Sequence, residues 1–578
     1  MDKYDKIVEL AKRRGFIWPA AELYGGVRGF IDFGPLGAAL KRNIEEKWRR
    51  WFILRHQDFI VEIETPVVMP ARVFEASGHL EHFTDFIVEC TKCHRKFRAD
   101  HLIVEQTEIR DVESLSIEEL NSIIKEKNVK CPECSGELGL VQTFNLLFKT
   151  TIGPYSESIG YARPEAAQGM FLAFKRVYEV MRNKLPLGIA QLGRVLRNEI
   201  SPRQGPIRLR EFTIMELELF FDPEDPKCPL FDDFRDEPLN LLPVKDITSG
   251  LKEPRQLTAG EAVEQGLILN EWIAYFMVLG RDFAKSLGIP EDCQMFIEKL
   301  PQERAHYSAQ TYDQVVKLER WGWVEIAGYS HRTDYDLKRH MEYSGVDLRV
   351  FKPFSQPIIT EKFVVKPNMR VIGKTLRGDA KKIISVLQSM SSDEIISELN
   401  GRGFIEILGF KLNRDCFIIT KEKFEVKGRR FIPQVIEPSF GADRIVYATL
   451  EYAFSEKNGR IVLRLPKDVA PIQVCVFPLV NKDGLPELAF QVYERLRNSG
   501  LRVEYDDSGS IGRRYVRADE IGVPIAVTVD YQSLNDNTVT LRDRDTWRQV
   551  RVGIKDIDVL IKSYIEGRVK FHELGPLV

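Results

Sequence analysis

The chain of 578 residues lacks the features that mark membrane and secreted proteins. No apolar run reaches the length of about 20 residues that a membrane-spanning helix needs. The N-terminal segment MDKYDKIVELAKRRG has no apolar signal-peptide core. A strong charge of one sign is also missing, because 83 Lys and Arg residues nearly balance 85 Asp and Glu residues, for a net charge of −2. We therefore expect a cytoplasmic protein with no membrane partner, in which any RNA-binding surface is local.

Cysteine is sparse, and half of the eight cysteines fall into two Cys-x-x-Cys pairs. The paired residues are Cys90, Cys93, Cys131 and Cys134. Four thiolates at such spacing are typical of a closed, structural zinc site. Between the pairs, Ser116 and Glu119 form a capping-box pattern that predicts a helix near 116–127. Reduced free thiols are the alternative, and a cytosolic setting disfavours disulfides.

The length and a hydrophobic content of 44% predict a globular protein of two to four domains. We divide the chain into a first domain, 1–466, and a second domain, 467–578. The first contains three inserts, at 87–142, about 222–300 and about 345–430. The last 112 residues alternate strand and helix patterns, which predicts a small α/β layer domain.

The most informative segment is QLGRVLRNEISPRQGPIRLREFTIMELELFF. It predicts two strands, 189–200 and 209–221, joined by a loop rich in Pro and Gly. Because side chains alternate along a strand, Arg197 and Glu199 share one face of the first strand. The same alternation places on one face of the second strand Arg210, Phe212, Ile214 and Glu216. Such a surface suits a nucleoside triphosphate, since arginine forks bind phosphate, a ring stacks on the base and a carboxylate accepts from an amine. An ordinary hairpin with solvated charges is the alternative for this segment alone.

A second element, EPSFGADRIVYATLEYAF, lies at 437–454. Residues 431–439 are predicted as a strand, Gly441 as a turn, and the following residues as a helix. Arg444 falls in the first helical turn, where backbone amides already favour anions. A structural arginine is the alternative, but the agreement with the first element favours a phosphate contact.

Together, RNE…REF and GADR resemble motifs 2 and 3 of the class II aminoacyl-tRNA synthetases. The resemblance implies that Arg197 grips the α-phosphate of ATP, that Phe212 stacks on adenine and that Arg444 holds the γ-phosphate, which makes the two arginines catalytic. The ATP site implied by the resemblance comprises Arg197, Asn198, Glu199, Ile207, Arg208, Leu209, Arg210, Glu211, Phe212, Glu325, Ile326, Gly441, Ala442, Asp443 and Arg444.

A helical stripe near the N-terminus, followed by DFIVEIETPVVMP, resembles motif 1 of the same family, which builds the dimer interface. The stripe consists of Leu36, Leu40, Ile44, Trp48 and Trp51. Either Pro66 or Pro70 corresponds to the proline of the motif. The resemblance implies a homodimer, and packing within one chain is the alternative role of the stripe.

Further segments resemble glycyl-tRNA synthetases of the homodimeric, archaeal and eukaryotic-like type. They are YGGVRGFIDFGPLG, SGHLEHFTDF, FRADHL, ARPEAAQG and EPSFGADR. The resemblance implies that glutamates and Ser439 bind the ammonium group of glycine, that Arg98 reaches its carboxyl group, and that Glu325 lies beside ATP and meets magnesium. The implied glycine site comprises Arg98, Glu165, Phe212, Thr213, Ile214, Met215, Glu216, Glu437, Pro438 and Ser439.

The resemblance implies an α+β catalytic domain with an antiparallel six- or seven-stranded sheet and a C-terminal α/β anticodon-binding domain. It implies a ligase that uses ATP with Mg²⁺ to attach glycine to tRNA(Gly) through glycyl-adenylate, releasing AMP and pyrophosphate. A prolyl or threonyl enzyme is one alternative, although a threonyl enzyme would need an active-site metal, and here the cysteine pairs lie in an insert. An inactive paralogue is the other, although both motif arginines are present.

Two surfaces carry weaker expectations. In the second domain, Arg542, Arg544, Arg548 and Arg551 either present charge to the anticodon or belong to a solvated hairpin. The inserts of the first domain either approach the acceptor arm of tRNA, as such inserts can in this family, or elaborate the surface.

Overall fold

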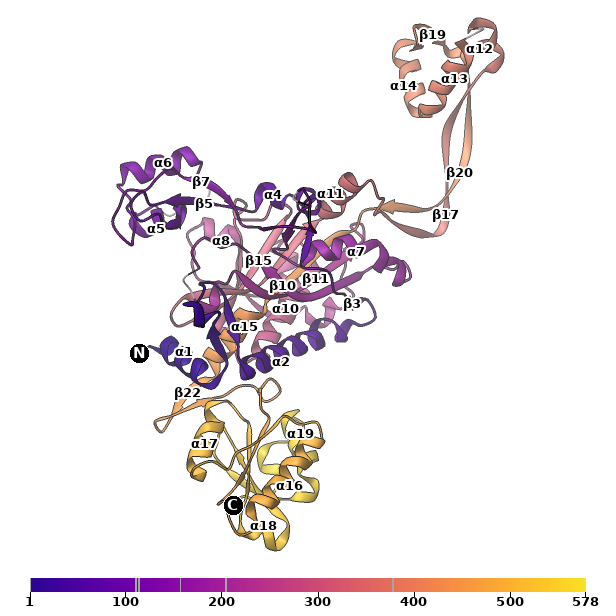
Figure 1. The fold of residues 1–578 in the computed structure, drawn as a ribbon. Helices are drawn as coiled ribbons and strands as arrows, with labels where there is room; N and C mark the ends of the chain where they lie inside the picture. Colours follow the sequence, from indigo (N-terminus) through magenta and orange to yellow (C-terminus); the bar gives the residue numbers. More distant parts are fainter. Residues whose placement is uncertain (1, 110–111, 113–114, 156, 203–204, 377–378) are drawn as a thin grey trace. The chain divides into compact units, whose positions relative to one another are not determined.

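The computed structural model describes residues 2–109, 112, 115–155, 157–202, 205–376 and 379–578. It divides into two compact units. Unit 1 contains Met1–Leu348 and Pro433–Val578, and unit 2 is Arg349–Ile432 (Figure 1). No helix among the described residues is both long and apolar enough to cross a membrane.

A nine-stranded sheet in the order β13-β12-β14-β15-β16-β21-β11-β10-β3 forms the centre of unit 1. Its strands are β3 Ile60–Glu62, β10 Leu187–Leu196, β11 Glu211–Phe221, β12 Pro238–Leu242, β13 Arg255–Thr258, β14 Gln294–Glu298, β15 Gln310–Leu318, β16 Gly322–Thr333 and β21 Gln434–Gly441. The six strands from β14 to β10 pair antiparallel, whereas β3 runs parallel to β10 and β12 runs parallel to β14.

The predicted antiparallel sheet of six or seven strands therefore describes the centre but not the mixed edges. The edge strands β3, β12 and β13 have three to five residues each, too few for a clear alternation of polar and apolar side chains. The segment about 222–300, predicted as an insert, supplies β12, β13 and β14 to this sheet and contributes buried residues to its core. It is built into the body of the sheet.

Three helices cover one face of the central sheet, and the core of unit 1 lies between them and this face. They are α2 Pro35–Phe52, α10 Glu271–Ser286 and α15 Ala442–Ala453. Strand β11 turns Met215, Leu217 and Leu219 toward this core, and all three are fully buried. Helix α2 begins with Pro35 at its first turn, where a missing N–H costs nothing. The predicted stripe of α2 packs into the same core, with Trp48 fully buried against Phe440.

The opposite face of β11 meets helix α7, Ala167–Val180. The ring of Phe220 stacks on that of Phe174 with centroids 4.3 Å apart. Farther along the same face, toward the start of β11, the side chains become polar. This change along one strand opens the space in which the candidate site lies.

The cysteine-bearing insert has its own small core. It contains the three-stranded sheet β6-β5-β7 and two helices. Its elements are β5 Thr84–Glu89, β6 Lys96–Arg98, α5 Ala99–Gln106, α6 Ile117–Glu126 and β7 Gln142–Asn145. The predicted helix is α6, and its capping box between Ser116 and Glu119 is formed in both directions.

Unit 2 is a two-stranded ribbon that carries a helical module at its tip (Figure 1). The ribbon consists of β17 Val350–Pro367 and β20 Phe417–Phe431, and the helices are α12 Met369–Leu376, α13 Ala380–Ser389 and α14 Ser392–Arg402. Residues 349–432 contain 17 Lys and Arg against 9 Asp and Glu. The unit is thus strongly basic in a chain whose overall charge is slightly negative.

The C-terminal part of unit 1 contains a five-stranded sheet in the order β25-β24-β26-β27-β28. Its strands are β24 Val474–Pro478, β25 Val503–Tyr505, β26 Ile525–Val529, β27 Thr538–Asp543 and β28 Gln549–Gly553. Arg542 and Arg544 of the predicted basic hairpin are buried, and Arg542 pairs with Asp519 at 2.9 Å. The expectation that these two present charge to a ligand is wrong, since both side chains are turned inward; Arg548 is exposed.

Candidate functional site

The two sequence elements that carry the family resemblance lie on neighbouring strands. Strand β10 ends at Leu196, four residues before the predicted end, so Arg197 begins the loop that follows. The loop stays aligned with β11, because the Arg197 N–H donates to the Arg210 carbonyl oxygen at 2.8 Å. On its other edge β11 pairs with β21, with Glu216 opposite Ser439. The strand order thus brings RNE…REF and GADR together.

A small cavity holds most of the predicted ATP residues. Those that line it are Arg197, Glu199, Ile207, Arg208, Leu209, Phe212, Glu325, Ile326, Gly441, Asp443 and Arg444. The predicted residues outside its described lining are Asn198, Arg210, Glu211 and Ala442. Arg210 is turned toward the loop backbone, where its guanidinium donates to the carbonyl oxygens of Glu199 and Arg28 at 2.9 and 3.0 Å. Ala442 is fully buried in the core beneath.

Backbone oxygens fix both motif arginines. Arg444 donates from Nε to the Ile207 carbonyl at 2.8 Å and from Nη1 to the Glu325 carbonyl at 2.9 Å. Arg197 donates from Nε to the Pro164 carbonyl at 3.1 Å, and its guanidinium lies 5.3 Å from the centre of the Phe212 ring. A guanidinium held in this way presents a fixed fork to phosphate and needs little reordering when a ligand binds.

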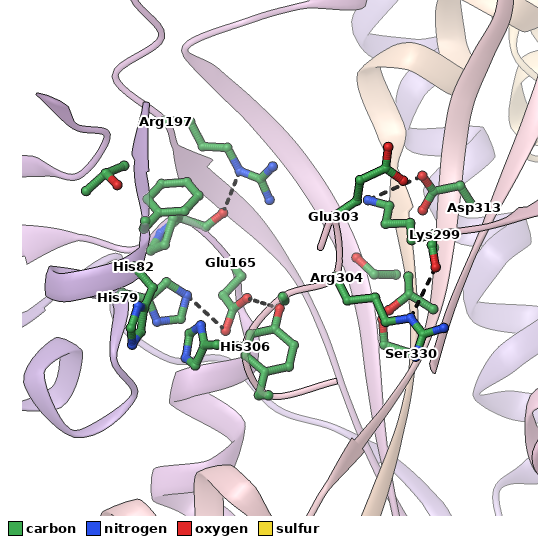
Figure 2. Close-up of a pocket in the computed structure, with 18 of the residues that line it drawn as sticks. His79, His82, Glu165, Arg197, Lys299, Glu303, Arg304, His306, Asp313 and Ser330 are labelled. Atoms are coloured by element: carbon green, nitrogen blue, oxygen red, sulfur yellow. Dashed lines mark hydrogen bonds and ion pairs between the residues drawn. The ribbon is translucent and has the colours of Figure 1, made fainter. Parts of the chain in front are cut away.

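A larger cavity of about 640 Å³ adjoins the first and is acidic. The predicted glycine residues that line it are Arg98, Glu165, Glu216, Glu437 and Ser439. Figure 2 shows the side chain of Glu165 at this cavity, with His79 and His306 beside it. His79 Nε2 lies 3.5 Å from the Glu165 carboxylate.

The other predicted glycine residues do not line this larger cavity. Phe212 and Ile214 line the smaller one. Thr213 and Met215 lie on the opposite face of β11, and Pro438 is buried on the opposite face of β21 from Glu437. Adjacent residues of a strand point to opposite faces, so the side chains of Thr213, Met215 and Pro438 are turned away from the larger cavity, and their assignment to the glycine site stays a prediction.

The pocket acids converge on one arginine that the sequence analysis missed. Arg332 is fully buried and donates to Glu165 at 3.1 Å, to Glu437 at 3.0 Å and to Asp336 at 3.0 Å. Its guanidinium also lies 3.7 Å from the centre of the Tyr307 ring. The spacing of four between Arg332 and Asp336 is a common surface pattern, so the sequence alone gave little sign of this role.

The surroundings give the pocket acids different proton affinities. Burial opposes ionisation of Glu165, but Arg332, His79 and Gln168 together outweigh burial and hold the pKa of Glu165 well below its usual range. Burial, only partly offset by Arg332, raises the pKa of Glu437 to about 8. Glu216 accepts from the N–H groups of Ala166 and Ala167 at 2.6 and 3.0 Å. Its other oxygen accepts from the Ser439 hydroxyl at 2.9 Å.

Two carboxylates at the junction of the cavities could hold a divalent cation. Asp313 on β15 and Glu325 on the neighbouring strand β16 both line the larger cavity, and Lys299 reaches Asp313 at 3.3 Å (Figure 2). Burial and the charge of Glu325 raise the pKa of Asp313 to about 7. Carboxylate oxygens are the ligands that Mg²⁺ prefers. Sequence reasoning missed Asp313, since a single Asp in a predicted strand carries no motif.

Arg98 contacts acids at the edge of the larger cavity. It pairs with Asp85 at 3.1 Å and also with Asp100. Burial, only partly offset by Arg98, raises the pKa of Asp85 to about 6. The arginine is therefore already partnered by carboxylates at the position where the resemblance expects it to meet a substrate carboxylate.

The four paired cysteines form a compact cluster. Their sulfur atoms all lie within 4.8 Å of one another. The Sγ distances are 3.6 Å both from Cys90 to Cys134 and from Cys93 to Cys131. Tetrahedral zinc with Zn–S bonds of about 2.3 Å places sulfur atoms about 3.8 Å apart. The donor set and its spacing fit such an ion.

Known proteins resemble this chain along its whole length. The glycine–tRNA ligase of Aeropyrum pernix is 54% identical over 577 residues, 99% of each chain. That of Pyrococcus abyssi is 49% identical over 98% of this chain and 99% of its own.

The chain belongs to the glycine–tRNA ligase family.

Two other comparisons concern the fold of the chain. Residues 473–564 match the family described as "Anticodon binding domain". A prolyl-tRNA synthetase from Cryptosporidium parvum, solved with L-proline and AMP, superposes with a TM-score of 0.50 at 13% identity. The match covers 97% of this chain and 75% of that one. The class II synthetase fold and the family predicted from the motifs are thereby confirmed.

Proposed function

We propose that this glycine–tRNA ligase attaches glycine to tRNA(Gly) in two steps and consumes ATP. The observation that carries the proposal is the union, on one sheet face, of an acidic cavity with a second cavity in which two arginines are held by backbone oxygens. The smaller has fixed arginines suited to phosphate, and the larger has buried carboxylates suited to an ammonium group.

In the first step, a carboxylate oxygen of glycine attacks the α-phosphorus of ATP, and pyrophosphate leaves. Arg197 and Arg444 hold the phosphate oxygens and stabilise the charge that develops on them. Phe212 offers its ring to adenine at the wall of the smaller cavity. In the second step, a hydroxyl of the 3′-terminal ribose of tRNA attacks the glycyl carbonyl carbon, and AMP leaves. Positioning the two reactants accounts for most of the acceleration.

Glycine selection rests on the acidic cavity. Glu165, Glu216 and Glu437 surround the ammonium group, and Ser439 adds a hydroxyl. A methyl group in an accommodating pocket changes binding by only about 1–3 kcal/mol. Alanine must therefore be rejected by overlap with the pocket wall and by displacement of its ammonium group from the acids.

Magnesium is the cation that the ATP reaction requires, and Asp313 with Glu325 would hold it. When bound, it neutralises phosphate charge during the transfer. In this chain the two carboxylates project from paired strands at the junction of the cavities, which supports the assignment.

We assign zinc to the cluster of Cys90, Cys93, Cys131 and Cys134. The separate core of this insert supports a structural role, because the metal would fasten the ends of a short chain segment whose own apolar core is small.

The region after residue 466 would select tRNA, while residues 1–466 activate glycine. All residues that line the two cavities precede residue 466, which supports this division. Removing residues 467–578 should leave glycine-dependent pyrophosphate exchange within a few-fold and abolish most charging. Circular dichroism would verify that the shortened protein folds, and loss of exchange in a folded protein would contradict the division.

Unit 2 would add a contact to tRNA. Its excess of basic residues supports this role, since neutralising phosphates drives RNA binding. Lys362 and Lys427 are exposed on the ribbon. Changing both to Glu should weaken tRNA binding in filter assays at low salt and leave pyrophosphate exchange intact. Unchanged binding would make unit 2 a surface elaboration.

The family resemblance also supports a cytoplasmic homodimer. The apolar stripe of α2 packs into the core of its own chain, so a dimer would use surfaces around that helix. Light scattering after gel filtration should give twice the mass of one chain, 66.7 kDa. A mass of one chain at micromolar concentration would contradict the dimer.

Aminoacylation tests the proposed function as a whole. Purified tRNA(Gly) should accept labelled glycine in the presence of ATP and Mg²⁺, while tRNA(Pro) and tRNA(Thr) should not accept proline or threonine. Charging of either of the latter would support the rival assignments, and no charging of any tRNA would support an inactive paralogue.

A further inference from the structure

A buried glutamate beneath the acidic cavity has no hydrogen-bond partner among the described residues. Glu218 lies on β11 two residues beyond Glu216 and so shares its face. Its side chain is fully buried, and both carboxyl oxygens are unpartnered within the described part of the chain. Buried carboxyl groups are normally paired or hydrogen-bonded, so this one requires an explanation.

The strand register places Glu218 beside the glycine pocket. Glu216 pairs with Ser439 and Leu219 with Ile436, so Glu218 lies across from Glu437 on β21. Directly opposite residues have their Cβ atoms about 5 Å apart. The two carboxyl groups are therefore near neighbours in a volume that water does not reach freely.

The charges around this pair do not balance. The titratable and charged groups that face it come from β11, β16, β21, α11 (Tyr335–Ser344), α4 (His79–His82) and the loops before α7 and β15. They are Glu165, Glu216, Glu218, Glu437, Asp336, Arg332, Tyr307, His79 and His340. Five carboxyl groups thus share one guanidinium. Burial lowers the pKa of His340 and raises that of Tyr307, so neither adds a charge near neutral pH.

The partners of the other acids show which group must stay neutral. Arg332 binds Glu165, Asp336 and Glu437. Burial and the charge of Glu165 raise the pKa of Glu216, but the N–H groups at the start of α7 and the Ser439 hydroxyl offset part of this rise. Glu218 receives neither kind of support. Burial and the nearby Glu437 accordingly raise the pKa of Glu218 well above its usual range.

We infer that Glu218 is held as a neutral carboxylic acid beneath the glycine pocket, and that the ammonium group of glycine displaces one proton from the neighbouring Glu437 when it binds. This rests on the proposed function, and it adds a proton to the binding step. The O–H bond of Glu437 breaks, its proton passes to solvent, and the carboxylate pairs with the ammonium group.

The protonation of Glu437 in the pocket without glycine sets the direction in which pH changes the KM for glycine. Because the pKa of Glu437 is about 8, Glu437 holds its proton at lower pH, and glycine must then compete with that proton. The KM for glycine should therefore fall as pH rises, by up to about tenfold per unit below pH of about 8, and then level off. The KM for ATP should not follow the same curve, since Glu437 does not line the smaller cavity.

Titration calorimetry in two buffers of different ionisation enthalpy counts the protons directly. The full-length enzyme should release close to one proton per glycine at pH of about 7 and fewer at pH of about 9. Glu437→Gln should abolish the release and flatten the pH dependence of the glycine KM. In Glu218→Gln the release should persist, because an amide is neutral like the acid it replaces, and the infrared carbonyl band of a buried carboxylic acid should disappear.

Two results would overturn the inference. One is glycine binding without proton release, and the other is loss of the release in Glu218→Gln, which would make Glu218 the titrating group. In either case normal glycine-dependent pyrophosphate exchange would leave the proposed function standing. Absence of that exchange at every pH would instead remove the proposed function itself.

Discussion

The two cavities on the face of the central sheet differ in the balance of their charges, although they share the same strands: acids outnumber basic residues in the larger, whereas three arginines and three acids line the smaller. On β11, Phe212 and Ile214 line the smaller cavity, while Glu216 lines the larger. On β21, Glu437 and Ser439 line the larger one. A shift of a few residues along a strand therefore converts a surface for phosphate into a surface for an ammonium group.

The cavities also differ in how deeply their charges lie. The side chain of Arg444 is 33% exposed, whereas that of Glu437 is 7% exposed and that of Arg332 is fully buried. Charges interact more strongly when they are removed from water. The larger cavity can therefore shift the pKa values of its acids, whereas the smaller cavity depends on the fixed positions of its arginines. The predictions below test this contrast.

The largest effect is expected from the ATP side. Arg444→Ala should lower glycine-dependent pyrophosphate exchange by about 10²–10³-fold in kcat/KM, because it removes a fixed donor to a phosphate that gains charge during the reaction. Arg235→Ala is a matched control, since Arg235 forms an ion pair with Glu264 and lines neither cavity. Equal activities of the two variants would remove the ATP assignment.

Substitutions on the glycine side should raise the KM for glycine and spare that for ATP. Glu165→Gln should raise the glycine KM by about 10–100-fold, since Glu165 is ionised and its loss removes a charged contact. Glu437→Gln should have a smaller effect at pH of about 7 than at pH of about 9, because a proton already occupies Glu437 in the empty pocket at the lower pH. Exchange assays with varied glycine decide this, and unchanged glycine dependence in both variants would mean that the pocket is misplaced.

A moderate effect is expected where the two cavities meet. Asp313→Asn should raise the Mg²⁺ concentration needed for half-maximal exchange by about tenfold, as loss of one carboxylate ligand weakens binding of a hard cation. Asn keeps the size of the side chain, so the fold is preserved. A Mg²⁺ dependence identical to that of the unaltered enzyme would exclude Asp313 as a ligand.

The smallest effect on activation is expected far from both cavities. Cys131→Ser should lose most of the zinc, which metal analysis should find near one equivalent in the unaltered protein. Pyrophosphate exchange should stay within about threefold, because a closed structural site takes no part in the reaction. Full metal content in the variant, or a metal-free parent protein, would contradict the zinc assignment.

The sequence predicted those parts of the site that form local patterns. RNE…REF and GADR identified the smaller cavity because their residues are close in the chain and alternate along strands. The capping box at Ser116 predicted helix α6 for the same reason. Arg332 and Asp313 escaped notice, since each acquires its role only when strands distant in sequence pair side by side.

The errors have physical causes as well. Thr213, Met215 and Pro438 were included through their neighbours in the family motifs; strand alternation turns their side chains away from the cavities, and their assignment stays a prediction. The count of strands was low because the edge strands are short and carry little pattern. Arg542 and Arg544 have the composition of an RNA-binding surface, but both side chains are buried, and Arg542 pairs with the buried Asp519.

The central claim is that an acidic cavity beside the ATP cavity selects glycine. The most direct test is pyrophosphate exchange by the unaltered enzyme without tRNA, measured with each of the standard amino acids in turn. The account predicts exchange with glycine and, for alanine, proline and threonine, exchange close to the background without amino acid. Exchange with alanine comparable to that with glycine, or none with glycine, would contradict it.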